Sequence, residues 1–342
     1  MMSDVYDLDI ISSSDKFLDK TTVIYGESGT GKSVLIVDIL HALKKHIDQA
    51  MVFSPTDRQN HTYDNGVIPA PFIHYTMSEK ILDDIWLRQE ALVAMYTRSN
   101  ALAVLHSLYR KVPSNIRSSA DATLRIIDCK MREHVADADD AQITKMQEDC
   151  DGLKIRVYKQ IIKANDDIIS RLELSKEEAF CYKYHDVNPR MVLIFDDCTD
   201  LIKKHRNTSV MQKLFYQGRH AKITAIIACH TDKSLDAELK KNASISIFTE
   251  QSCALAYFTR VSTNLDKDDQ NRARSCLKQV FGGGVAHQKL AWVRHEKKFY
   301  KFVAVQRKDF RFCNQILWDF ARASEAEAGR VSSNNPFVHA FK

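Results

Sequence analysis

The segment from residue 21 to residue 43 constrains the fold of this chain most strongly. A run rich in β-branched residues at 21–25 is followed by a glycine-rich loop, and an apolar helical pattern at 34–43 follows at once. The loop reads GESGTGKS over 26–33, which fits the pattern G-x-x-x-x-G-K-[ST]. A strand, such a loop and a helix in this order predict a phosphate-binding loop. Its backbone N–H groups point into one concavity at the positive end of the helix dipole.

The loop assigns candidate roles in binding ATP and Mg²⁺. Lys32 is expected to reach the β- and γ-phosphates, and the Ser33 hydroxyl is expected to bind Mg²⁺. Glycines suit the loop because side chains would keep the backbone away from the phosphates. The residues expected to bind the nucleotide are Gly26, Glu27, Ser28, Gly29, Thr30, Gly31, Lys32, Ser33 and Val34. The alternative is a chance match in a flexible loop.

A second strand pattern ends in an acidic pair. Residues 191–195 form a near-continuous apolar run, as expected of a central parallel strand covered on both faces, and Asp196 and Asp197 follow it. A P-loop enzyme holds its Mg²⁺ with an acidic residue at the carboxyl end of such a strand. We therefore predict that Asp196 contacts the metal through water and that Asp197 orients the attacking water. The alternative is a pair of carboxylates that cap the next helix.

The order of the remaining elements predicts an α/β fold. Stretches at 50–54, 223–229 and 243–249 resemble strands, residues 290–305 follow a hairpin pattern, and residues 76–185 are helical in pattern. This layout predicts a three-layer RecA-like P-loop NTPase core with a mainly parallel sheet, a long helical insertion and a C-terminal β-hairpin. In that class an extra strand separates the loop strand from the acid-bearing strand.

The same layout predicts four regions. They are the N-terminal half of the ATPase core (1–75), the helical insertion (76–185), the C-terminal half of the core with the hairpin (186–322), and a mobile tail (323–342). Capping boxes are expected at Thr76 with Glu79 and at Ser175 with Glu178. The insertion is either an arm that grips DNA or a partner, or extra packing around the core, and the second interpretation is favoured.

Composition sets looser limits on function. The chain has 342 residues with 49 basic and 44 acidic side chains, and its net charge of +5 is compatible with a polyanionic partner without proving one. The eight cysteines form no C-x-x-C pattern, which argues against a zinc module and favours a reducing, intracellular setting. The acidic N-terminus has no apolar core of a signal peptide, and no apolar run approaches the ~20 residues that span a bilayer.

Four phrases together resemble the genome-packaging ATPases of poxviruses and related large DNA viruses, a branch of the FtsK–HerA superfamily. They are GESGTGKS (26–33), VFSPT (52–56), LIFDDC (193–198) and GRHAKIT (218–224), the last of which stands before an apolar strand. The resemblance covers residues 21–75 and 186–260. It implies an ATP-driven, homo-oligomeric ring that moves double-stranded DNA into a capsid. Capsid or portal-vertex proteins are then candidate partners, and the host cytoplasm at the viral assembly site, or the virion, is the expected location.

The resemblance also suggests roles for two further residues. Arg219 matches the arginine that reaches the γ-phosphate of the neighbouring subunit, where it would neutralise charge in the transition state. Its alternative is a surface arginine near a helix C-terminus. His230 stands where the superfamily usually has a glutamine that senses the γ-phosphate, and Asp197 stands where glutamate is common. Because of these two departures, the sensor role of His230 and the way Asp197 positions the attacking water stay open.

A translocase is expected to grip the DNA backbone through lysine and arginine without reading bases. The candidate residues are Lys203, Lys204 and Arg206; Lys240 and Lys241; Lys297, Lys298 and Lys301; and Arg307, Lys308 and Arg311. The first cluster is favoured because it follows the acid strand, although each cluster could also be a solvated face. Two other functions stay open: a cellular or plasmid-borne FtsK–HerA-type DNA pump or helicase, and a nucleotide-gated assembly scaffold with little turnover.

Overall fold

The computed structural model describes residues 8–11, 14–135, 139–231, 235, 237–260, 267–282, 288–308 and 310–323. Contacts divide the chain into two compact units, residues 1–87 with 190–342 and residues 88–189. The predicted mobile tail lies outside the described residues except for its first position. In the part of the chain that the structure describes, no helix has the length and apolarity needed to cross a membrane.

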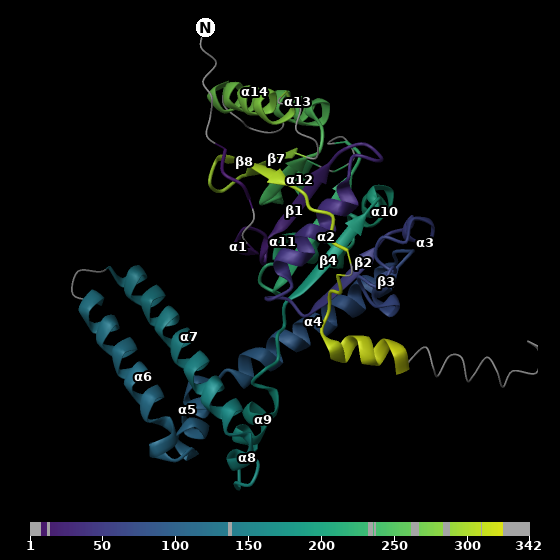
Figure 1. Ribbon diagram of the computed structural model, residues 1–342. Coiled ribbons are helices and arrows are strands. Elements are labelled where there is room, and N and C mark those ends of the chain that lie inside the picture. Colours follow the sequence, from purple (N-terminus) through teal and green to yellow (C-terminus); the bar gives the residue numbers. More distant parts are fainter. Residues whose placement is uncertain are drawn as a thin grey trace, which may run out of the picture. The chain divides into compact units, whose positions relative to one another are not determined.

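The first unit is built on one eight-stranded sheet with the order β3-β2-β4-β5-β1-β6-β7-β8 (Figure 1). The strands are β1 (Thr21–Tyr25), β2 (Gln49–Phe53), β3 (Ile73–His74), β4 (Met191–Asp196), β5 (Ile223–Cys229), β6 (Ile245–Phe248), β7 (Gln288–Val293) and β8 (Lys298–Val303). Strands β1 to β6 pair in parallel, whereas β7 is antiparallel to both β6 and β8. The predicted α/β class and the mainly parallel sheet are confirmed.

Strand β5 lies between β1 and β4. Its pairs include Thr21 with Ala225 on one side and Met191 with Ile223 on the other. The extra strand between the loop strand and the acid-bearing strand is therefore confirmed. Every residue of β4 and β5 is buried, as the apolar runs predict for strands covered on both faces.

Helices pack on this sheet (Figure 1). They are α1 (Ser14–Phe17), α2 (Lys32–Leu43), α3 (Asp57–Asn60), the start of α4 (Glu79–Ser99), α10 (Thr199–His205), α11 (Ser209–Gln217), α12 (Ala237–Asn242), α13 (Gln251–Thr259) and α14 (Lys267–Phe281). Most residues of α2 are buried, as its apolar sequence predicts, and α13 and α14 cover the β6–β8 end. The predicted hairpin is present, and it extends the main sheet because β7 also pairs with β6.

The second unit is helical. It holds the end of α4 together with α5 (Leu102–Lys111), α6 (Ser114–Val135), α7 (Asp140–Ala164), α8 (Asp166–Ile169) and α9 (Lys176–Tyr184). It has its own core, in which Leu105, Leu108 and Ile162 are fully buried. The Ser175–Glu178 capping box is present. The box predicted at Thr76 is wrong, since α4 begins at Glu79 and the Ser78 hydroxyl accepts the N–H of Ile81 instead.

Glu178 joins the start of α9 to α5 in the second unit. Its carboxylate accepts the N–H of Ser175, the Lys111 ammonium and the Ser107 hydroxyl. The Ser175 N–H first, and then Lys111 and Ser107, lower the pKa of Glu178 from 4.5 to about 2. A carboxyl group whose pKa is lower in the folded state stabilises the fold at pH values above its unfolded-state pKa. This stabilisation is lost as the pH falls through the folded-state pKa.

Glu178→Gln is therefore expected to lower the free energy of unfolding at pH 7 by about 1–3 kcal/mol. The gap between wild type and variant should shrink as pH falls from 4.5 towards about 2. Urea unfolding followed by circular dichroism at pH 7 and pH 3 measures both effects. Glu173→Gln is the matched control because that side chain is exposed. An equal gap at the two pH values would contradict this account.

Candidate functional site

The phosphate loop spans residues 26–31, between the end of β1 and the start of α2. Gly29 and Gly31 have φ angles of 79° and 86°, a region that favours glycine. Gly26 is required for a different reason: a Cβ there would lie 1.7 Å from the Oγ1 atom of Thr249, which follows β6. The loop is thus a cradle of bare backbone, closed on one side by the end of a neighbouring strand.

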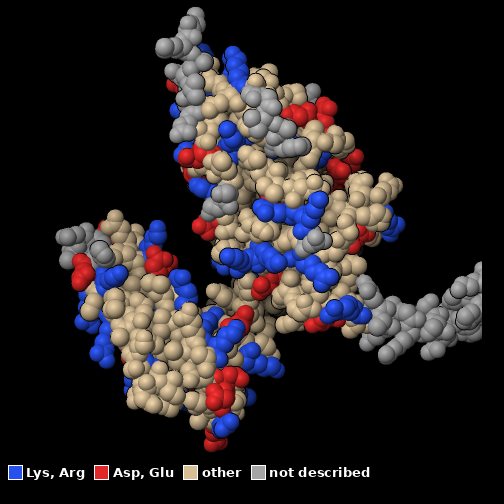
Figure 2. All heavy atoms as spheres, in the orientation of Figure 1, with Lys and Arg blue, Asp and Glu red and all other residues tan. Residues whose placement is uncertain are grey.

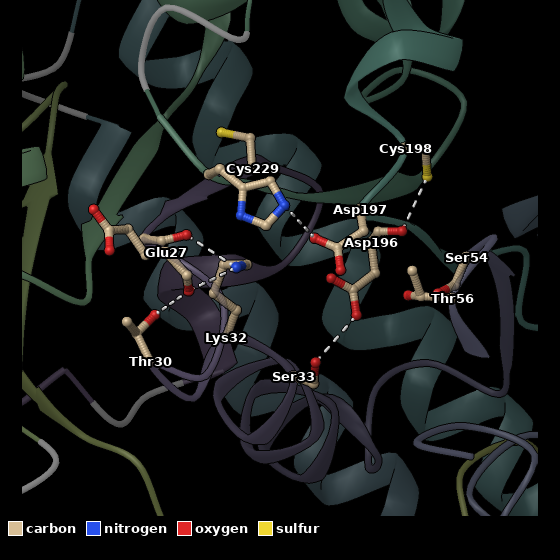
Figure 3. Close-up of polar contacts among 12 residues, drawn as sticks. Glu27, Thr30, Lys32, Ser33, Ser54, Thr56, Asp196, Asp197, Cys198 and Cys229 are labelled. Carbon is tan, nitrogen blue, oxygen red and sulfur yellow. Dashed lines mark hydrogen bonds and ion pairs between the residues drawn. The ribbon is translucent and has the colours of Figure 1, made fainter. Parts of the chain in front are cut away.

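Lys32 is buried at the first position of α2. Its ammonium donates to the carbonyl oxygens of Gly26 at 2.9 Å and Glu27 at 3.0 Å. It therefore lies across the mouth of the loop, and phosphate oxygens could exchange for these two neutral acceptors. Figure 3 shows Ser33 and Asp196 directed towards each other, and the Lys32 ammonium turned to the loop carbonyls beside Glu27.

Ser33 and Asp196 lie 163 positions apart in the sequence, and the fold brings them together. The Ser33 hydroxyl donates to Asp196 Oδ2 at 3.2 Å, and the Tyr63 hydroxyl donates to the same oxygen at 2.8 Å. Only 4% of Asp196 is exposed, and this burial raises its pKa to about 6. Its other oxygen, Oδ1, is buried without a hydrogen-bond partner among the described residues.

This donor set fits a magnesium ion. Mg²⁺ prefers hydroxyl, carboxylate and water oxygens, and proteins commonly hold it with one or two carboxylates plus substrate phosphates. An orphaned buried carboxylate oxygen needs an explanation, and a bound cation with its waters would supply one. Ser33 and Asp196 are therefore the residues that could hold the metal beside the loop.

Asp197 and His230 lie at the carboxyl ends of the adjacent strands β4 and β5. Asp197 has a φ angle of 53°, and its Oδ1 lies 3.4 Å from His230 Nε2. Left-handed backbone at a non-glycine residue is uncommon, and such strain concentrates at functional positions. The structure thus brings the half-exposed imidazole of His230 beside the second acid, while Asp197 Oδ1 accepts no hydrogen bond from the described residues.

Arg219 does not reach the loop of its own chain. It lies between α11 and β5, before the first residue of β5, Ile223. Because β4 and β5 are parallel, Arg219 is at the opposite edge of the sheet from Asp196. It is exposed, and its Nε donates to His220 at 3.3 Å. This position leaves open both the trans arginine and the surface arginine near a helix C-terminus.

Four residues at the site, three beside the loop and one beside Asp196, were not found from the sequence. They are Tyr63, Thr249, Glu250 and Lys289. Tyr63 is held by the buried Asp57, whose carboxylate accepts the N–H groups of residues 62, 63 and 64. Glu250 accepts the Glu27 N–H at 2.6 Å. No motif surrounds any of the four: strand order brings Thr249, Glu250 and Lys289 to the loop, and the turn held by Asp57 brings Tyr63 to Asp196.

The basic clusters differ in how many of their side chains form ion pairs with carboxylates of the same chain. Lys203, Lys204 and Arg206 are exposed on or just after α10, and Lys203 pairs with Asp200 at 3.4 Å. Figure 2 shows further Lys and Arg side chains gathered over α2 and the segment that leads from β8 to the helical residues 315–323. There Arg307, Lys308 and Arg311 line one hollow, although Arg307 also pairs with Asp38. Of the remaining candidates, Lys298 pairs with Asp9.

Strand order and site together define a P-loop NTPase fold of the RecA-like division. The chain belongs to the same family as the uncharacterized protein B354L of African swine fever virus. It is 31% identical to B354L of isolate Pig/Kenya/KEN-50/1950 over 342 residues, which covers 95% of this chain and 94% of that protein. A shorter match, 36% identical over 76 residues, covers 22% of this chain and 26% of the uncharacterized protein L437 of Acanthamoeba polyphaga mimivirus.

No protein-family model matches the chain. Among solved structures, B204, the DNA-packaging ATPase from Sulfolobus Turreted Icosahedral Virus, matches 83% of this chain and 97% of its own. The identity is 14% and the TM-score is 0.38. The conjugation coupling protein TcpA of pCW3 matches at 13% identity with a TM-score of 0.37, over 85% of this chain and 62% of its own.

Tyr63→Phe is expected to raise the Mg²⁺ concentration that half-saturates MgATP binding by about 10-fold, because groups that orient a metal-holding carboxylate typically contribute this much. The ring is kept, so only the hydrogen bond to Asp196 is lost. Calorimetric titration of ATP at a series of Mg²⁺ concentrations gives the value. Tyr75→Phe is the control: it also removes one tyrosine hydroxyl, but it keeps the ring on which the Arg58 guanidinium packs. An unchanged Mg²⁺ dependence would rule out this role for Tyr63.

Proposed function

We propose that this chain is an ATP-hydrolysing motor that translocates double-stranded viral DNA into a capsid as a homo-oligomeric ring. The observation that carries the enzymatic part is the contact between Ser33 Oγ and Asp196 Oδ2 at 3.2 Å, beside the Lys32 ammonium. The viral family and the four matching sequence phrases support the packaging part. Capsid or portal-vertex proteins are the proposed partners, and the viral assembly site in the host cytoplasm, with the virion, is the proposed location.

The proposal assigns a role to each residue of the site. Lys32 and the loop N–H groups bind and orient the β- and γ-phosphates, while Ser33 and Asp196 hold Mg²⁺. When bound, Mg²⁺ neutralises charge that develops on the transferred phosphoryl group. Asp197 positions the attacking water and accepts its proton. His230, whose Nε2 lies 3.4 Å from Asp197 Oδ1, stands in the place of the usual sensor glutamine.

The position of Arg219 is compatible with a ring in which the arginine acts on a neighbouring copy. The residue is exposed at the opposite edge of the sheet from the aspartate pair. It can therefore act at a triphosphate only when a neighbouring copy presents its own loop to that edge. An arginine supplied in trans is worth about 10³–10⁵ in turnover. A head-to-tail interface of this kind closes into a ring when its rotation permits.

The first test is the ATPase rate with and without linear duplex DNA at two salt concentrations. We expect stimulation by DNA that weakens as salt rises, because contacts to the DNA backbone release counterions. The Asp197→Asn protein should bind MgATP like wild type and lose about 10²–10⁴-fold in turnover. The Lys32→Ala protein should fail to bind. Nucleotide-dependent assembly with negligible turnover, with or without DNA, would instead identify a scaffold.

The second test mixes two inactive proteins. Arg219→Ala keeps its own loop and acid pair, and Lys32→Ala keeps Arg219. If the arginine acts in trans, a mixture should regain ATPase activity above either protein alone, because one variant supplies the arginine to the other's triphosphate. Each variant mixed with wild type is the control for assembly. Mixtures that never exceed the separate variants, while both still assemble with wild type, would exclude a trans role for Arg219.

A further inference from the structure

A hollow of about 320 Å³ adjoins the phosphate loop on the β7 side of β1, whereas the acid pair lies on the β4 side. It is lined by Gly29, Thr30, Gly31, Val34, Lys289, Ala304 and Gln306. Three of these residues belong to the loop, and the rest come from α2, β7 and the segment after β8. Because residues 29–31 line both the loop and the hollow, a group attached to a triphosphate in the loop could enter the hollow.

Lys289 is the charged group of this hollow. It is 6% exposed, and its ammonium donates to the carbonyl oxygen of Thr30 at 2.7 Å. Burial lowers the pKa of Lys289, although the carboxylate of Glu250 opposes this shift. An ammonium has three N–H donors, and the Thr30 carbonyl takes one of them. Keeping such a cation buried is costly unless it meets further acceptors.

One wall of the hollow is apolar. Val34 follows Ser33 in the first turn of α2 and is 36% exposed although it is a large aliphatic residue. Ala304 adds a methyl group, and the exposed Gln306 adds an amide that can both donate and accept. A few polar groups beside an apolar wall are typical of sites for small molecules and cofactors.

We propose that this hollow holds the base of the bound nucleotide, packed on Val34 and read at its edge by Lys289. The inference rests on the proposed binding of nucleotide in the loop and adds which residues select the base. Lysine can only donate, so it reads ring nitrogens and keto oxygens and cannot accept from an amino group. Guanine offers O6 and N7 side by side, which suits a lysine well. The site therefore binds GTP at least as well as ATP.

The test compares ligands with and without a base. MgATP, MgGTP and magnesium tripolyphosphate are titrated into the full chain by calorimetry. Lys289→Met should weaken the binding of ATP by about 10-fold and that of GTP by more, since a hydrogen bond to a charged group contributes this much to affinity. The same variant should weaken the binding of tripolyphosphate by less than that of either nucleotide, because the lysine also supports Thr30 of the loop. Lys278→Met, an exposed lysine on α14, is the control.

Gln306→Ala gives a second variant that keeps the buried lysine. It should also weaken the binding of both nucleotides and leave the binding of tripolyphosphate unchanged. The test can therefore be made with this variant if Lys289→Met does not fold. An equal loss for all three ligands in Lys289→Met would mean that the lysine only supports the loop, and would overturn the inference. Unchanged nucleotide affinity in both variants would overturn it too. Wild-type protein that binds none of the ligands would instead refute the proposed function.

Discussion

The hydrogen bond between Ser33 and Asp196 is the contact on which the site depends. It joins the first turn of α2 to the end of β4 across β5, at 3.2 Å. The bond requires that β1, β5 and β4 be neighbours in parallel, because only then do the loop and the acid share one edge of the sheet. The buried apolar strands thus stabilise the fold and also bring a hydroxyl and a carboxylate together.

Holding a carboxylate in this position is costly. Asp196 is almost fully buried, and burial raises its pKa to about 6. Hydrogen bonds from Tyr63 and Ser33 oppose that shift, and Asp57 in turn holds the backbone around Tyr63. A buried acid with one unpartnered oxygen is an unstable arrangement by itself, and it becomes favourable beside a divalent cation. Local strain at Asp197 is a second sign that this edge is shaped for chemistry.

Much of this arrangement could be predicted from sequence because its signals are local. The loop motif, the apolar runs of β4 and β5, and the acidic pair each lie within a few residues, and the structure has the predicted strand between loop and acid. Tyr63 and Lys289 could not be found in this way. Tyr63 comes from a loop with no motif, and Lys289 reaches Thr30 only because β7 pairs with β6. The two-residue strand β3 was missed because it is too short to show a period.

The central claim is that one magnesium–triphosphate lies between the loop and Asp196. The most direct measurement is a crystal structure of the full chain with Mg²⁺ and a non-hydrolysable ATP analogue. The account predicts a metal about 2.1 Å from Ser33 Oγ. Asp196 should then accept a hydrogen bond from a metal-bound water, and Lys32 should contact the β- and γ-phosphates. A nucleotide bound elsewhere, with Ser33 and Asp196 still bonded to each other, would contradict the account.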